Sequence, residues 1–189
     1  AVGEIVFAEP AYMCYNDAAF VPNDPLFPQQ WSEQNTGQQN PWVPGADVQA
    51  VDAWDIERGS PNVIVAVIDT GMDLNHEDLR DNLLPRNGAD WDFASSDTSP
   101  DDEGDHGTAC SGIAVGVQDN GIGISGIAPG CRIMPLRVNL SSGQNANRAD
   151  AINYAASRRA EFDGLVMSLL LAHVLGRLHG GGKRRGQCG

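Results

Sequence analysis

Two residues of complementary chemistry, Asp69 and His106, stand 37 positions apart in this 189-residue chain. Asp69 follows the unbroken apolar run VIVAVI at 63–68, which predicts a strand buried on both faces of a parallel sheet. Open α/β sheets place ligands and catalytic groups at the carboxyl ends of such strands. A carboxylate there can accept the Nδ1 proton of a histidine and stabilise the imidazolium. For an isolated Asp-Thr-Gly, a helix-capping aspartate is the alternative.

His106 begins the sequence His-Gly-Thr at the predicted start of a helix. A histidine titrates near neutrality and can serve as a general base. Taken alone, a histidine in this position more often has a structural role. Because it follows a strand-end aspartate within one predicted strand–helix unit, we expect Asp69 and His106 to be partners.

The elements that position this pair are predicted from the periodicity of apolar residues. Strands alternating with helices indicate an α/β fold in which a parallel β-sheet is flanked by helices and joined by right-handed crossovers. In the first helix Val48, Val51 and Trp54 or Asp55 lie on one side, and in the last helix Ala149, Ile152 and Ala156 share a face. The predicted strands are 63–68 and 132–138, and the predicted helices are 47–57, 106–117 and 148–159.

The composition excludes some classes of partner. Twelve Lys and Arg stand against 25 Asp and Glu, and the resulting net charge of −13 argues against nucleic acid, whose phosphates need a basic face. The longest apolar stretch, 165–175, is too short to span a bilayer, so we expect no membrane segment. The acidity suits a secreted protein or one that holds cations. Four cysteines form neither a zinc-type C-x-x-C pair nor a disulfide scaffold.

Six segments together form a specific combination of motifs: VPNDPLFPQQW (21–31), VIVAVIDTGMDLNHEDL (63–79), DWDFASSDTSP (90–100), DHGTACSGIAV (105–115), NGIGISGIAPGCRIMPLRV (120–138) and AINYAAS (151–157). They resemble the subtilases, the subtilisin-like serine proteases, and within them the thermitase-like and proteinase K-like members. The resemblance covers roughly residues 21–163 and implies a subtilisin-like three-layer fold, incomplete in this chain. It also implies a secreted endopeptidase that acts on protein or peptide substrates.

By that resemblance Asp69 orients His106, and His106 is the general base for a serine hydroxyl. The family's Gly-Thr-Ser nucleophile motif and its Ala-Gly-Asn oxyanion motif do not occur in the 189 residues. The serines at 111, 125, 142 and 168 lack the context that presents a nucleophile, so we assign none. We therefore expect a truncated chain that is inactive alone.

Two other functions remain open. One is a non-catalytic pseudoprotease or calcium-binding module. The other is a metal hydrolase built on His76, His106 and nearby carboxylates, although no H-E-x-x-H or comparable ligand spacing occurs.

Calcium is the cofactor that the sequence suggests, at one or two sites. Three aspartates recur in the loop that contains Asp92, Asp97 and Asp101, and their hard oxygen atoms are the kind that Ca²⁺ takes. A solvated acidic loop is the alternative. The resemblance adds the carbonyl of Ser99 to this loop site. It also implies a stronger site, made by Asp24, Asp78, Asn120 and the main-chain carbonyls of Val117, Ile122 and Ile124.

The resemblance also divides the chain. Residues 1–20 are similar to the end of an inhibitory propeptide and its linker, which makes the chain's own propeptide an expected partner. Residues 21–163 correspond to the N-terminal portion of the catalytic domain, and Ser142 and Gly143 lie where the substrate-binding strand runs. Residues 164–189 depart from the family pattern and contain no acidic residue, as expected of a frame-shifted or disordered tail. Cys110 matches a free thiol beneath the catalytic histidine, with an inert buried cysteine as the alternative.

Overall fold

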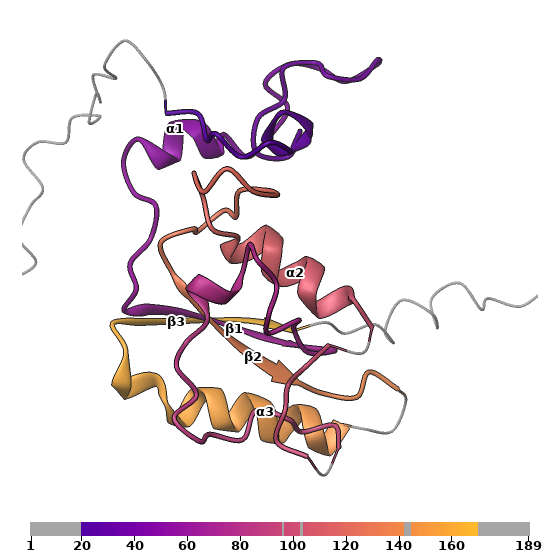
Figure 1. Ribbon diagram of the computed structural model, residues 1–189, viewed down its shortest axis with the longest axis vertical. Helices are drawn as coiled ribbons and strands as arrows, with labels where there is room; N and C mark the ends of the chain where they lie inside the picture. The colour runs from indigo at the N-terminus through magenta and orange to yellow at the C-terminus, as the bar shows by residue number, and fades with distance from the viewer. Residues whose placement is uncertain (1–19, 96, 103, 142–144, 170–189) are drawn as a thin grey trace, which may run out of the picture.

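The computed structural model describes residues 20–95, 97–102, 104–141 and 145–169 (Figure 1). The expected propeptide end up to residue 19 and the substrate-binding pair Ser142 and Gly143 therefore lie outside the described residues. Among the helices of the described part, none is long and apolar enough to cross a membrane.

A parallel sheet with the strand order β2-β1-β3 forms the centre of the fold. Its strands are β1 (Val63–Asp69), β2 (Arg132–Arg137) and β3 (Gly164–Leu169). In the register, Ile64 lies opposite Arg132 of β2 and Leu165 of β3. The helices α2 (His106–Val115) and α3 (Asn145–Ser157) lie on opposite sides of this sheet (Figure 1). The predicted α/β class and its three layers are confirmed.

Alternate residues of β1 supply the two halves of the core, because successive side chains of a strand point to opposite faces. Ile64, Ala66 and Ile68 join the cluster that contains Ala151 and Ala155 of α3. Val65 and Val67 join the cluster that contains Val115 of α2. Both faces of β1 are thus covered, which explains its continuous apolar run.

The N-terminal part of the described chain is less helical than predicted. Helix α1 spans only Ala50–Trp54, and it begins no earlier than Ala50 because Gln49 at its N-cap takes a left-handed conformation with φ of 55°. Val48 consequently lies outside the helix and is 64% exposed, whereas Val51 and Trp54 pack with Phe27. Three short 3-10 helices complete the described elements: η1 (Phe27–Gln29), η2 (Arg80–Asn82) and η3 (Arg159–Glu161).

Helix α3 starts three residues earlier than predicted and buries a different face. Ala151 and Ala155 are fully buried against the sheet, whereas Ala149 and Ala156 are exposed and Ile152 is half-buried. Residue type does not indicate which face is buried, because four of the five predicted or observed contact positions of this helix are alanines.

Strand β3 is an edge of the sheet in the described part of the chain. Val166 and Met167 are 56% and 45% exposed, respectively, although β3 pairs with β1 along its whole length. Among the described residues no further strand pairs with the outer edge of β3.

Candidate active site

Asp69 is the last residue of β1, and its side chain is 4% exposed. Its Oδ1 atom lies 2.8 Å from Nδ1 of His106 and also accepts a hydrogen bond from the Thr70 amide at 2.7 Å. The main chain at this point is fixed as well, because the Val138 amide donates to the Asp69 carbonyl at 2.7 Å. The carboxylate is therefore held in one orientation toward the histidine.

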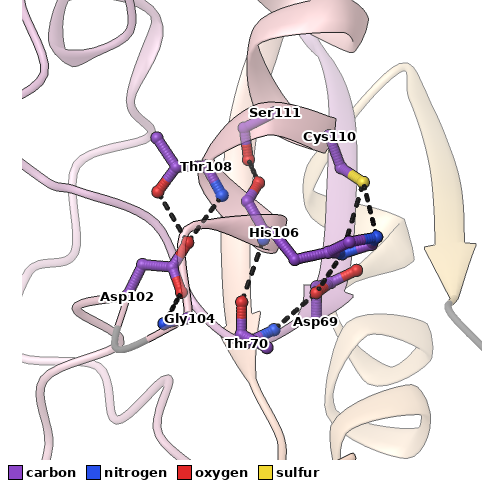
Figure 2. A network of polar contacts seen from close by, with 9 residues as sticks. Asp69, Thr70, Asp102, Gly104, His106, Thr108, Cys110 and Ser111 are labelled. Atoms are coloured by element: carbon purple, nitrogen blue, oxygen red, sulfur yellow. Dashed lines mark hydrogen bonds and ion pairs between the residues drawn. The ribbon is translucent and has the colours of Figure 1, made fainter.

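His106 is the first residue of α2, and its side chain is 47% exposed (Figure 2). A carboxylate beside Nδ1 favours the tautomer that carries the proton on that atom, because an ionised carboxylate can only accept. The lone pair of Nε2 is then available to take a proton from a substrate or a nucleophile. The structure thus brings together the two residues that the sequence analysis paired.

Close main-chain packing lets α2 approach the end of β1. A Cβ atom on Gly107 would lie 2.0 Å from the Gly71 carbonyl oxygen, so a side chain at Gly107 would push the helix away. Gly71 itself has φ of 115° and faces the carbonyl oxygens of Pro100 and Asp101. These two glycines explain how Asp69 and His106 reach hydrogen-bonding distance.

Cys110 lies one helical turn after His106, with Sγ 3.6 Å from Nδ1 and 3.9 Å from Nε2 of the histidine ring. Burial raises the pKa of this thiol, and the negative charges of Asp69 and Asp102 raise it further. A thiol whose pKa is raised is less often ionised and so less nucleophilic at neutral pH. Cys110 is thus a free thiol beside the histidine ring and is half-buried, not buried as the inert-cysteine alternative expected.

Two of the described serines, Ser111 and Ser125, have hydrogen-bond partners other than His106. Ser111 is buried and donates its hydroxyl to the Gly107 carbonyl at 2.6 Å, and Ser125 is buried and accepts from the Gln118 amide at 2.9 Å. Within the described part of the chain, the recorded polar partners of the His106 ring are Asp69 and Cys110, and none is a serine.

The residues expected to form the stronger calcium site lie together. Asp24 and Asp78 are 1% and 2% exposed, respectively. Oδ1 of Asp78 accepts from the Asn120 side chain at 2.9 Å, and both oxygens of Asp24 accept from the amides of 119 and 120. Gly123 shapes the pocket, since its Cβ would lie 2.3 Å from the Asp78 carboxylate. The 117–124 turn contacts these carboxylates through its main-chain amides, including that of Ile124, which donates to Asp78 at 2.9 Å.

Electrostatics at this position also fit a cation. Burial raises the pKa of Asp78, and the charge of Asp24 adds to that effect, while hydrogen bonds from the Ile124 amide and from Asn120 oppose it. Among the described residues, no Lys or Arg forms an ion pair with either carboxylate. Two buried carboxylates that repel each other are a suitable pair of ligands for Ca²⁺.

The loop of Asp92, Asp97 and Asp101 is assembled differently. Asp92 forms a buried ion pair with Arg137, with 2.9 Å between Nη1 and Oδ2. The Ser95 hydroxyl lies 2.8 Å from a carboxylate oxygen of both Asp92 and Asp97, and the Ser99 amide donates to Asp97. Asp101 is exposed and has no recorded contact with the other two in the described part. Arg137 already compensates the charge of Asp92, so the residues at this loop fit a cation less well.

The metal-hydrolase alternative finds little support. Among the described residues, one group of three His, Cys, Asp or Glu side chains is close enough to share an ion, and it consists of Asp69, His106 and Cys110. His76 is not part of it. Instead, Nδ1 of His76 accepts from the Asp78 amide at 3.2 Å.

Residues 60–168 match the model of the subtilase family, a span that contains Asp69 and His106. The chain belongs to the subtilase family. Over 159 residues it is 38% identical to thermitase of Thermoactinomyces vulgaris, which covers 83% of this chain and 50% of the relative. It is 34% identical over 139 residues to the calcium-dependent protease of Trichormus variabilis, which covers 71% of this chain and 20% of the relative.

A third relative is the extracellular basic protease of Dichelobacter nodosus, 29% identical over 212 residues and covering 95% of this chain and 32% of the relative. Among solved structures, a protease of Pseudoalteromonas arctica superimposes with a TM-score of 0.57 at 31% identity, covering 71% of this chain and 44% of that one. The structural match to a protease is therefore consistent with the family assignment. The subtilase chain described here spans half or less of the length of these relatives.

Proposed function

We propose that Asp69 and His106 are the orienting carboxylate and the general base of a subtilisin-like serine endopeptidase. The observation that carries this proposal is the 2.8 Å contact between the buried Asp69 carboxylate and Nδ1 of His106 at the carboxyl end of β1. His106 would take the proton of a serine hydroxyl on Nε2, and Asp69 would stabilise the resulting imidazolium. The substrate class is protein or peptide.

The serine and the oxyanion donor would come from sequence outside these 189 residues, since neither Gly-Thr-Ser nor Ala-Gly-Asn occurs in them. We accordingly propose that this chain alone does not hydrolyse peptide bonds. We also propose that the protein is secreted and that residues 1–20 are the end of its propeptide and the linker. The extracellular protease among the relatives supports the first of these.

A chimera tests the function. We expect residues 20–163, joined to the remaining C-terminal part of thermitase, to hydrolyse casein, because that part contributes the family's nucleophile to the Asp69–His106 pair. The chain alone should show no activity above the buffer blank. Substitution His106→Ala in the chimera should abolish hydrolysis.

Thermal unfolding followed by circular dichroism serves as the control that the chimera and its variant are folded. A folded chimera without activity, or full activity after His106→Ala, would contradict the proposed roles. Activity of the isolated chain that disappears in His106→Ala would contradict its inactivity.

We further propose that Asp24, Asp78 and Asn120 hold Ca²⁺ together with the carbonyls of Val117, Ile122 and Ile124. The buried, mutually repelling carboxylates support this, as does the calcium-dependent protease among the relatives. Asp24 lies near the beginning of the described chain and the 117–124 turn follows α2. A bound ion would therefore tie the N-terminal segment to the helix that carries His106. The Asp92, Asp97, Ser99 and Asp101 loop remains a second, weaker candidate.

Removing calcium should lower the melting temperature. An ion that binds only the folded state at 100 times its Kd stabilises by about 2.7 kcal/mol, which corresponds to roughly 5–10 °C for a chain of this size. We expect that shift on adding a chelator, as measured by differential scanning calorimetry. Asp78→Asn should remove the calcium dependence, because it deletes a charged ligand.

The matched control is Asp150→Asn, which removes the same charge from an exposed position on α3. It should keep the full response to the chelator. A melting temperature of the unsubstituted chain that does not change on chelation would count against both calcium sites.

A further inference from the structure

The first turn of α2 obtains its hydrogen-bond partners from outside the helix. Its N-cap residue, Asp105, takes a left-handed conformation with φ of 58°, and its side chain makes no capping bond. The first amides of a helix have no partner within it. The Gly107 amide instead donates to the Thr70 hydroxyl at 2.9 Å, and the Thr108 amide donates to Oδ2 of Asp102 at 2.8 Å.

Asp102 accepts hydrogen bonds from Thr108 and Gly104, on either side of the start of α2 (Figure 2). Its Oδ2 also accepts from the Thr108 hydroxyl at 2.7 Å, and its Oδ1 accepts from the Gly104 amide at 2.8 Å. Burial raises the pKa of Asp102, but hydrogen bonds from Thr70, Thr108 and the Gly104 amide outweigh it, and the pKa lies below its ordinary value. The group is thus an ionised acceptor at neutral pH.

These contacts connect the two residues of the catalytic pair. Thr70 directly follows Asp69, and Thr108 lies two residues after His106. The Thr108 hydroxyl also accepts from the Asp73 amide at 2.9 Å, so the chain after β1 is bound to the start of α2 at two points. The separation between the strand end and the helix start is therefore set by side chains other than Asp69 and His106.

We propose that Asp102 is a positioning residue that, with Thr70 and Thr108, forms a clamp fixing His106 against Asp69. This inference rests on the proposed function, since the geometry of the pair matters to catalysis only if His106 is a base. Asp102 acts through Thr70 and Thr108, because no direct contact with the His106 ring or the Asp69 carboxylate is recorded among the described residues. If Asp102 only capped the helix, replacing it would lower the stability of the fold but would leave the Asp69–His106 hydrogen bond unchanged in folded molecules.

The test follows the Nδ1 proton of His106 by NMR in the full chain, with its exchange with water as the readout. Hydrogen bonds to charged groups are strong enough that losing them should speed this exchange about tenfold or more. We expect that acceleration in Asp102→Ala. We expect wild-type exchange in Asp102→Asn, which loses the same charge but keeps an acceptor oxygen for Thr108.

Melting temperatures separate this effect from a loss of folding. If Asp102→Ala does not fold, Thr70→Val tests the clamp in its place. This variant keeps the charge of Asp102 and a side chain of similar volume, but it removes the hydroxyl that accepts from the Gly107 amide. Wild-type exchange in the folded Asp102→Ala or in Thr70→Val overturns the clamp. Equal acceleration in Asp102→Asn and Asp102→Ala also overturns it, because charge would then be the cause. A wild-type chain without an Asp69-bound Nδ1 proton overturns the catalytic pair itself.

Discussion

Replacing Asp69 with Asn lowers kcat for casein by about 10⁴-fold in the chimera that supplies a serine, a magnitude known from triad proteases, subtilisin among them. The structural reason is the 2.8 Å contact with Nδ1. An Asn side chain can present its NH₂ group to that atom, which favours the tautomer with the proton on Nε2. A histidine in that form cannot accept the proton of a serine hydroxyl.

The control for this prediction is Asp52→Asn, which removes the same charge from an exposed position on α1. It should leave kcat and KM unchanged. A decrease of less than about tenfold in Asp69→Asn, with the chimera folded, would show that the carboxylate does not control the histidine.

Replacing Gly107 with Ala should destabilise the chain by about 3 kcal/mol or more, the upper range for overpacking. The new Cβ would lie 2.0 Å from the Gly71 carbonyl oxygen and 3.0 Å from its nitrogen, and both are main-chain atoms that cannot rotate away. Relief would require α2 to move from the end of β1, which would also lengthen the Asp69–His106 contact. Urea unfolding of the purified chain measures the change.

Gly112 offers a matched control in the same helix. Its added Cβ would meet only the terminal Cδ1 of Ile124 at 3.3 Å, and that flexible side chain can shift. Since Ala favours a helix over Gly by about 1 kcal/mol, Gly112→Ala should be neutral or slightly stabilising. Equal free energies of unfolding for the two variants would contradict the close packing of α2 on β1.

The sequence was sufficient to predict the strand that ends at Asp69 and the helix that begins at His106. A continuous apolar run fixed the first, and the short His-Gly-Thr motif became informative once a strand-end aspartate preceded it. The face of α3 was predicted wrongly, because alanines at 149, 151, 155 and 156 carry no information about which side is buried. The helix predicted over 47–57 begins only at Ala50, because residue type does not indicate the left-handed conformation of Gln49.

Asp102 and Arg137 escaped the sequence analysis for a different reason. Asp102 is one of seven carboxylates between residues 87 and 105, and composition does not show which of them would meet the amides of α2. The sequence placed Arg137 in the predicted strand 132–138 and indicated no partner for it. In the structure it forms an ion pair with Asp92, which makes the loop a weaker candidate for a calcium site. The Arg137–Asp92 pair joins residues 45 positions apart, which local patterns do not encode. Asp102 binds Thr108 only six residues on, but from an irregular loop whose conformation the residue types do not indicate.

The central claim is that Asp69 holds the proton of His106 on Nδ1 and leaves Nε2 free to act as a base. The most direct test is the ¹⁵N NMR spectrum of the folded chain at a pH where the imidazole is neutral, with His106 assigned by comparison with His106→Gln. We predict a protonated Nδ1 and an unprotonated Nε2 in the unsubstituted chain, and a reversal of the two in Asp69→Asn. A proton on Nε2 of the unsubstituted chain, or a spectrum that Asp69→Asn does not change, would contradict the claim.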